Sequence, residues 1–80
     1  MPTVFREKGY RFFFVMADLQ EPLHIHVAKE KAIAKYWFDP VRLASNKGFR
    51  DHELREIADM IKSHEDLIRS HWDERLRSRY

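Results

Sequence analysis

Two histidines lie two residues apart at His24 and His26, within the stretch PLHIHV that spans residues 22–27. On a strand, alternate side chains point to the same face, so the two imidazoles would lie side by side, about 7 Å apart along the strand. Ile25 and Val27 would then form the core face, which argues against a buried structural role for both histidines. Such a pair suits proton transfer or metal binding, and it equally fits a polar face exposed to solvent.

Metal binding by this pair lacks a third ligand that spacing would fix. A His-X-His strand can supply two imidazoles to zinc, whereas a catalytic site normally has three protein ligands and an open position. The remaining candidates are Glu21, His52, His64 and His71. No spacing brings any of them to the pair, so we predict neither a metal nor a cofactor.

Acid–base chemistry on RNA is the other reactive possibility. His24 and His26 are the candidate catalytic residues, one taking the proton of a ribose 2′-hydroxyl and the other returning a proton to the leaving oxygen. The charge that develops on the phosphate needs a cation. Candidate substrate-binding residues on nearby predicted strands are Arg6, Arg11 and Lys35, although their faces cannot be assigned from the sequence.

The charge of the chain is mild but unevenly distributed. The formal net charge is +2, with 35% charged residues among 80. Residues 1–49 carry eight Lys and Arg against five Asp and Glu, whereas residues 50–80 carry seven against eight. The positive excess therefore lies in the half that holds the histidines, which neither demands nor excludes a nucleic-acid partner.

The cysteine content and the hydropathy of the chain indicate its cellular compartment. The absence of Cys rules out disulfides and thiolate metal sites and is compatible with a reducing cytosol. The longest apolar stretch, FFFVMA, is far too short to span a bilayer. We therefore predict a cytoplasmic protein with no membrane association.

The hydropathy pattern divides the chain into a sheet portion, residues 1–49, and a helical portion, residues 50–80. A period close to two predicts strands over 3–6, 10–17, 24–28 and 32–38, with a turn at Lys8 and Gly9 and a hairpin through KEK. Asp39 and Pro40 end the fourth strand. Residues 41–49 fit either a short strand or a single helical turn.

Aromatic residues are concentrated in the predicted strands. Exposed rings within RFFF or KYWF could stack on bases, as in proteins that bind single-stranded nucleic acid. Because a small domain needs its rings inside, we expect Phe12, Phe14 and Phe38 in the core. Either Tyr36 or Trp37 is then the ring expected to be partly exposed.

From Asp51 onward, apolar residues recur at helical spacing, at Leu54, Ile57, Ala58, Ile61, Ile68, Trp72 and Leu76. Asp51 is the expected N-cap, His64 the expected boundary residue on this stripe, and Trp72 the expected anchor to the sheet. We predict one α+β domain over residues 1–80. A small, mostly antiparallel sheet of four or five strands is covered on one face by one long C-terminal helix.

An ordered set of motifs resembles a family of small bacterial proteins classed as a domain of unknown function, with the signature PPHIHV. The motifs are MPTVFR, GYRFFF, EPLHIHV, AKYWFDPVRLA, the GF before the helix, and ELREI with a late Trp, and they run from Pro2 to Trp72. This resemblance implies a short protein encoded beside a second small protein, in an arrangement similar to a toxin–antitoxin pair. Leu23 departs from the second proline of the signature. Arg50 replaces a small capping residue, which moves the expected cap to Asp51 while Glu53 keeps its place in the first turn.

Two functional hypotheses follow. The first is a toxin-like, metal-independent ribonuclease of a toxin–antitoxin pair, which uses the histidine pair and has a small antitoxin-like partner protein. The second is a non-catalytic module whose histidine face and adjoining sheet edge bind a small protein or a nucleic acid such as RNA. An enzyme requires a concave site shared by the histidines and a cation, whereas a module permits a flat face.

Overall fold

The computed structural model describes residues 3–15 and 20–77. Five strands form one antiparallel sheet in which each strand pairs with the next along the chain. They are β1 (Thr3–Glu7), β2 (Tyr10–Phe13), β3 (His24–Lys29), β4 (Ala32–Trp37) and β5 (Arg42–Lys47). Two helices follow, α1 (Asp51–Ser63) and α2 (Glu65–Arg77). The predicted α+β architecture with an antiparallel sheet is confirmed.

Tight turns join β1 to β2 and β3 to β4. Lys8 and Gly9 both have positive φ, 53° and 85°, in the two-residue connection between β1 and β2. Such φ values at both central residues match the right-handed twist of paired strands. Glu30 and Lys31 join β3 to β4, and Glu30 also has positive φ. Both predicted turns are therefore confirmed.

The strand boundaries differ from the prediction by more than one residue at two places. The strand predicted over 10–17 ends at Phe13, and its last residues, Met16 and Ala17, lie outside the described residues. The ambiguous segment after Pro40 is strand β5, which pairs with β4 through a bulge. A glycine is required where β5 gives way to α1, because Gly48 has φ of 102° and a Cβ there would lie 3.2 Å from Ala32 Cα.

The prediction of one long helix is wrong, because the helix breaks at His64. The backbone of His64 is not helical, with φ −113° and ψ 20°. Its Nδ1 donates to the carbonyl of Met60 at 2.9 Å. That carbonyl also accepts from the backbone N–H of His64. The ring of His64 stacks on Phe5 of β1, with centroids 4.1 Å apart. Stacking on the sheet and bonding to the preceding turn thus hold His64 out of a continuous helix.

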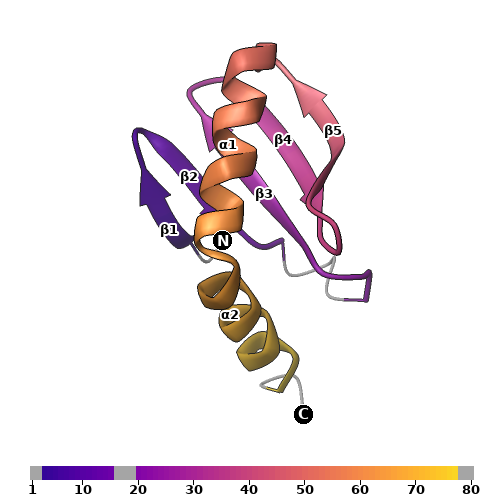
Figure 1. Ribbon diagram of the computed structural model, residues 1–80. Helices are drawn as coiled ribbons and strands as arrows, with labels where there is room; N and C mark the ends of the chain where they lie inside the picture. The colour runs from indigo at the N-terminus through magenta and orange to yellow at the C-terminus, as the bar shows by residue number, and fades with distance from the viewer. Residues whose placement is uncertain (1–2, 16–19, 78–80) are drawn as a thin grey trace.

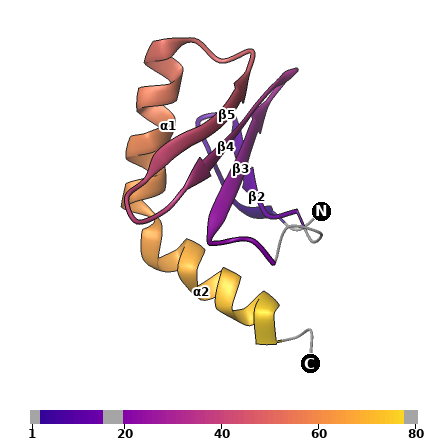
Figure 2. The same ribbon diagram turned by 90° about the vertical axis from the view of Figure 1, so that its right-hand side faces the viewer.

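The break changes what the helices cover. In Figures 1 and 2, α1 lies across one face of the sheet, while α2 turns beneath the end of the sheet at which β3 begins. Trp72 of α2 packs edge-on against Phe14, which confirms the predicted anchor. Within residues 3–15 and 20–77, neither helix has the length and apolar content needed to cross a membrane.

The core lies between α1 and the sheet face beneath it. The expected core residues Phe12, Phe14 and Phe38 are buried. Of the two rings named as candidates for partial exposure, Trp37 is half-buried, which confirms the expectation. Tyr36 is buried, and its hydroxyl donates to the carbonyl of Leu54 at 2.8 Å. The core cluster comprises Tyr10, Phe12, Phe14, Ile25, Val27, Ala34, Tyr36, Phe38, Phe49, Ile57, Met60, Ile61, Ile68 and Trp72.

The start of α1 also differs in one detail. Its N-cap is Arg50 rather than Asp51, which is the first helical residue. The carboxylate of Glu53 accepts from the backbone N–H of Arg50 at 2.9 Å, as expected for an acidic residue in the first turn. An Arg can occupy the cap position because this return bond satisfies its backbone N–H.

Candidate functional site on the open face of the sheet

The register of the sheet assigns each strand residue to one of two faces, because residues directly opposite in a ladder share a face. Phe12, Val27 and Ala34 lie opposite one another on the face under α1, which we call the covered face. The other face, called the open face, carries Thr3, Arg6, Arg11, Phe13, His24, His26, Ala28, Ile33, Lys35, Trp37, Arg42, Ser45 and Lys47. His24 and His26 thus share a face, and Ile25 and Val27 point into the core, as the alternation predicts.

His24 lies on the open side of β3 but is completely buried. Its ring is surrounded by the edges of His26, Trp37 and Trp72, with centroid distances of 5.2, 5.5 and 5.4 Å. Trp72 comes from α2, which reaches this end of the sheet because of the break at His64. The argument against a buried histidine is therefore wrong for His24, since the strand pattern could not show that α2 covers this end.

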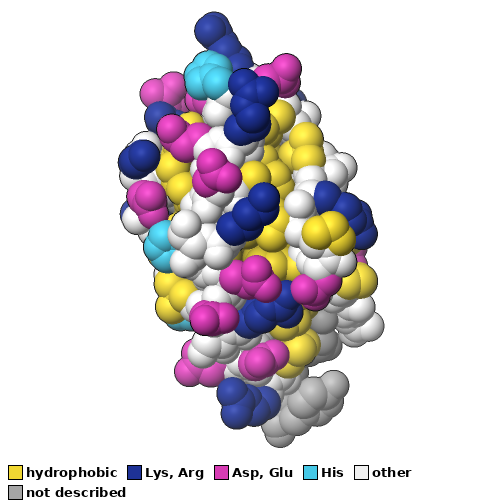
Figure 3. Space-filling view, viewed as in Figure 1, with side chains coloured by type: hydrophobic (Ala, Val, Ile, Leu, Met, Phe, Trp, Pro, Cys, Tyr) yellow, Lys and Arg dark blue, Asp and Glu magenta, His cyan; other side chains and the backbone are white. Residues whose placement is uncertain are grey.

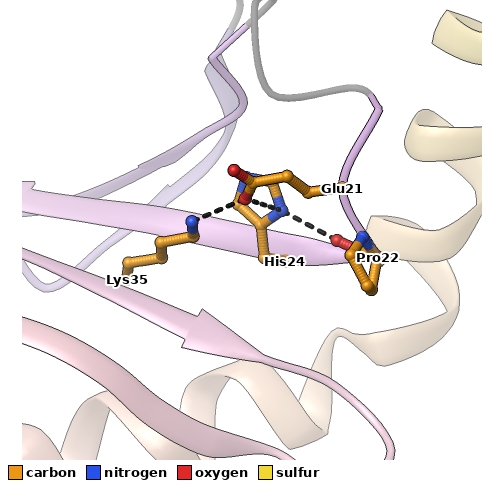
Figure 4. Close-up of polar contacts among 4 residues, drawn as sticks. All are labelled: Glu21, Pro22, His24 and Lys35. Carbon is orange, nitrogen blue, oxygen red and sulfur yellow. Dashed lines mark hydrogen bonds and ion pairs between the residues drawn. The ribbon is translucent and has the colours of Figure 1, made fainter.

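The side chain of His24 is also fixed in orientation. Its Nδ1 lies 2.9 Å from the carbonyl oxygen of Pro22, and 4.0 Å from the Glu21 carboxylate (Figure 4). A carbonyl oxygen only accepts hydrogen bonds, so Nδ1 carries a proton in this contact. The carbonyl of Pro22 thus orients the ring of a histidine that contacts no solvent.

His26 is half-buried and lies beside a different set of groups. Its ring stacks on Phe13 of β2, with centroids 5.6 Å apart and planes 22° from parallel. Lys35 of β4 is its direct partner in the ladder. Of the two candidate catalytic histidines, His26 is the one within reach of a molecule bound to the open face.

The three candidate cations all lie on the open face. Arg6 and Arg11 face each other across β1 and β2, and the Arg11 Nε donates to Thr3 Oγ1 at 2.7 Å. The guanidinium of Arg11 also lies over the ring of Phe13, 4.6 Å from its centroid. Lys35 lies two strands away, beside His26. The sheet therefore places Arg6, Arg11 and Lys35 on the same surface as the histidine pair.

Lys35 is held by two neighbours. Its Nζ donates to the Glu21 carboxylate at 2.7 Å (Figure 4) and lies 4.4 Å from the centroid of the Trp37 ring. Glu21 is 44% exposed, whereas Lys35 is 18% exposed. The ammonium therefore lies at the surface of the open face. An anionic ligand that binds it would have to replace the Glu21 carboxylate.

Two further cations of the open face were missed by sequence reasoning. Arg42 lies opposite Trp37, and Lys47 lies opposite Ile33. Both are exposed. The sequence analysis could have identified them if residues 41–49 had been assigned to a strand. Alternation that starts at Arg42 and includes one bulge places both residues on the same face as Trp37.

The other histidines serve elsewhere in the chain. His64 Nε2 lies 3.6 Å from the Glu7 carboxylate on the covered side, and His52 lies on α1. His71 belongs to α2 and is half-buried. Among the residues that the structure describes, no three His, Asp or Glu side chains are grouped in a way that could hold a metal ion.

Comparison with known proteins gives a family and no function. No curated protein and no solved structure matches the chain. A family model described as a domain of unknown function, DUF4160, matches residues 9–73, which include the histidine pair, β2 to β5, α1 and most of α2. The chain therefore belongs to the DUF4160 family.

Proposed function

We propose that the protein binds nucleic acid through the open face of its sheet. The observation that carries this proposal is the charge of that face. Arg6, Arg11, Lys35, Arg42 and Lys47 provide five cations there. Among the described strand residues, Glu7 has the only carboxylate, and it lies on the covered side beside His64. A phosphate backbone is a ligand that matches a surface of this sign.

The helix side of the molecule provides the contrast. Over α1, acidic and basic side chains alternate on the surface (Figure 3). They include Asp51, Arg55, Glu56, Asp59 and Lys62. Opposite charges that lie close together cancel within a Debye length, about 8 Å at physiological salt. Attraction of a polyanion is therefore expected at the open face rather than at the helix.

Binding of a fluorescent oligonucleotide, followed by anisotropy, tests the proposal. We expect Arg42→Glu to weaken binding by about tenfold, because it replaces a phosphate contact with a repulsive charge. Arg55→Glu on α1 is the matched control, since both arginines are exposed, and it should leave affinity nearly unchanged. Absence of binding at low salt, or an equal loss in the two variants, would contradict the proposal.

The salt dependence provides a second readout. If all five cations contact phosphates, a plot of the logarithm of the affinity against the logarithm of salt concentration should have a slope of about −3.5 for a single strand and about −4.5 for a duplex. Arg42→Glu should reduce this slope, and Arg55→Glu should not. A slope near zero for the wild type would show that the cations do not contact phosphate.

A second candidate is a toxin-like ribonuclease that needs no metal. The observation that favours it is the position of His26 directly opposite Lys35. In this hypothesis His26 takes the proton of the ribose 2′-hydroxyl, and the 2′-oxygen forms a bond to phosphorus as the bond to the 5′-oxygen breaks. The 5′-oxygen leaves with a proton from solvent, and Lys35 stabilises the charged phosphate. His24 does not touch the substrate in this scheme, because it is buried, and instead holds His26 in place through their edge contact.

The toxin hypothesis also implies a partner, which would be a small cognate protein with acidic side chains that neutralise the open face. Induced expression tests it directly. Wild type should arrest growth and cleave RNA in the presence of a chelator, His26→Ala should do neither, and co-expression of the neighbouring gene product should restore growth. If the folded wild type binds RNA without cleaving it, the proposed binding function stands and this second candidate is rejected.

A further inference from the structure

The open face carries aromatic rings as well as cations, and two of these rings are not fully buried in the core. His26 and Trp37 are half-buried rather than buried, and both point to the open side of the sheet. A cation accompanies a ring at two places on this face. Arg11 lies over Phe13, on which His26 stacks, and Lys35 lies over Trp37.

Half-buried rings at a surface suit a ligand with flat faces of its own, on which they can stack. In a double helix, the faces of the bases are stacked on one another and only phosphates, sugars and base edges are accessible. In a single strand the base faces are accessible, and aromatic side chains stack on them without regard to sequence. Cations alone would serve for duplex binding, so the rings favour unpaired bases.

We propose that the open face binds single-stranded nucleic acid, with bases stacked on His26 and Trp37 and phosphates held by Arg11, Lys35 and Arg42. This inference rests on the proposed function and specifies its ligand. His26 and Trp37 lie on adjacent strands, two positions apart in register. Strand spacing and rise place them about 8 Å apart, which leaves room for one base on each ring.

The cation over Trp37 fits this role. The ammonium of Lys35 lies 4.4 Å from the ring centroid, in the position that a stacked base would take. Its flexible four-carbon stem allows the ammonium to leave the ring and move to the adjacent phosphate. Binding thus exchanges a cation–ring contact for a base–ring contact and a phosphate contact. Arg42, opposite Trp37 on β5, is placed for the phosphate on the other side.

The test compares single-stranded and duplex oligonucleotides of one sequence, about 12 nucleotides long and thus within the range of sites formed by small sheet domains. RNA and DNA versions of both forms are measured by anisotropy, so that the sugar preference is read in the same experiment. We expect the single strands to bind at least about tenfold more tightly than the duplexes. Equal affinity for both forms would overturn the inference while leaving the proposed function intact, and no binding to any form would overturn both.

Ring variants test the stacking itself. Trp37→Leu keeps an apolar contact to His24 but removes the flat ring, so we expect about a tenfold loss of single-strand affinity and little change for duplex. Tryptophan fluorescence supports the assignment if single strands quench the wild type but not this variant, whose remaining indole is the buried Trp72. A folded Trp37→Leu protein with unchanged affinity would contradict stacking.

A second ring variant keeps the test decisive if Trp37→Leu does not fold. His26→Leu should weaken single-strand binding several-fold, and His52→Leu on α1 is its matched control, since His52 is exposed on the helix side. Circular dichroism establishes that both variants are folded. Equal affinities of the two folded histidine variants would contradict a role for His26.

Discussion

The two faces of the sheet are built from alternate residues of the same strands, yet they differ in almost every property. The covered face presents Phe12, Ile25, Val27 and Tyr36 to α1, and all four are buried. The open face presents cations and half-buried rings from the intervening positions. Folding accounts for the first face, because the apolar area removed from water there stabilises the domain. Folding does not account for the five cations on the second, and nucleic-acid binding is the role that we propose for them.

The largest expected effect tests whether the covered face carries the stability. Phe12 is fully buried and stacks on Phe5, with centroids 4.2 Å apart. Phe12→Ala should lower the free energy of unfolding by about 3–5 kcal/mol, from the lost transfer energy and the cavity left behind. On the open face, Arg6→Ala should change it by no more than about 0.5 kcal/mol. Urea unfolding measures both, and similar values would break the comparison between the faces.

The next effect tests the exception on the open side, the buried His24. His24→Ala removes the bond to Pro22 and leaves a cavity between Trp37 and Trp72, so we expect a loss of about 2 kcal/mol. His26→Ala should cost less than about 1 kcal/mol, since its ring is half-buried. A larger loss for His26 than for His24 would show that the two roles are reversed.

Alkaline pH tests the covered face through Tyr36. Burial raises the pKa of Tyr36 from 10.0 to about 12, so the folded state keeps a proton that the unfolded state loses. Stability is therefore fully present below pH 10 and falls as pH rises through the folded pKa, by about 1–2 kcal/mol for this group. Tyr36→Phe should remove this part of the loss. Because burial also raises the pKa of Tyr10, some alkaline loss should remain in the variant. Urea unfolding below pH 10 and at about pH 11 measures the difference. An unchanged alkaline loss in Tyr36→Phe would contradict this role.

Local pattern predicted most of the fold. Alternation in β3 and β4 and the Lys8–Gly9 turn follow from interactions between near neighbours in sequence, which a pattern reports directly. The break at His64 depends on Phe5, far away in the chain, which stacks on the histidine ring. One local sign was available, because the apolar stripe has no member between Ile61 and Ile68.

The candidate site divides in the same way. Strand alternation predicted that His24 and His26 share a face, since this depends only on β3. The burial of His24 depends on Trp72, which reaches it from α2. The charge of the open face depends on the pairing of five strands, so its five cations become visible as a group only once the register is known.

The smallest expected effect would sharpen the comparison, because it removes the carboxylate that opposes the charge of the open face. Glu21 accepts from Lys35 at 2.7 Å and is partly exposed. An ion pair of this kind contributes no more than about 1 kcal/mol, so Glu21→Gln should leave stability nearly unchanged. It should strengthen nucleic-acid binding several-fold, since Lys35 no longer has to leave a carboxylate to reach a phosphate.

Glu56→Gln is the matched control for that measurement, since it removes an exposed carboxylate from α1 and changes the net charge equally. If both variants bind more tightly by the same factor, overall charge is responsible and the open face has no special role. If only Glu21→Gln gains affinity, the gain is local to Lys35. Because screening weakens an exposed ion pair, the difference between the two variants should be largest at low salt.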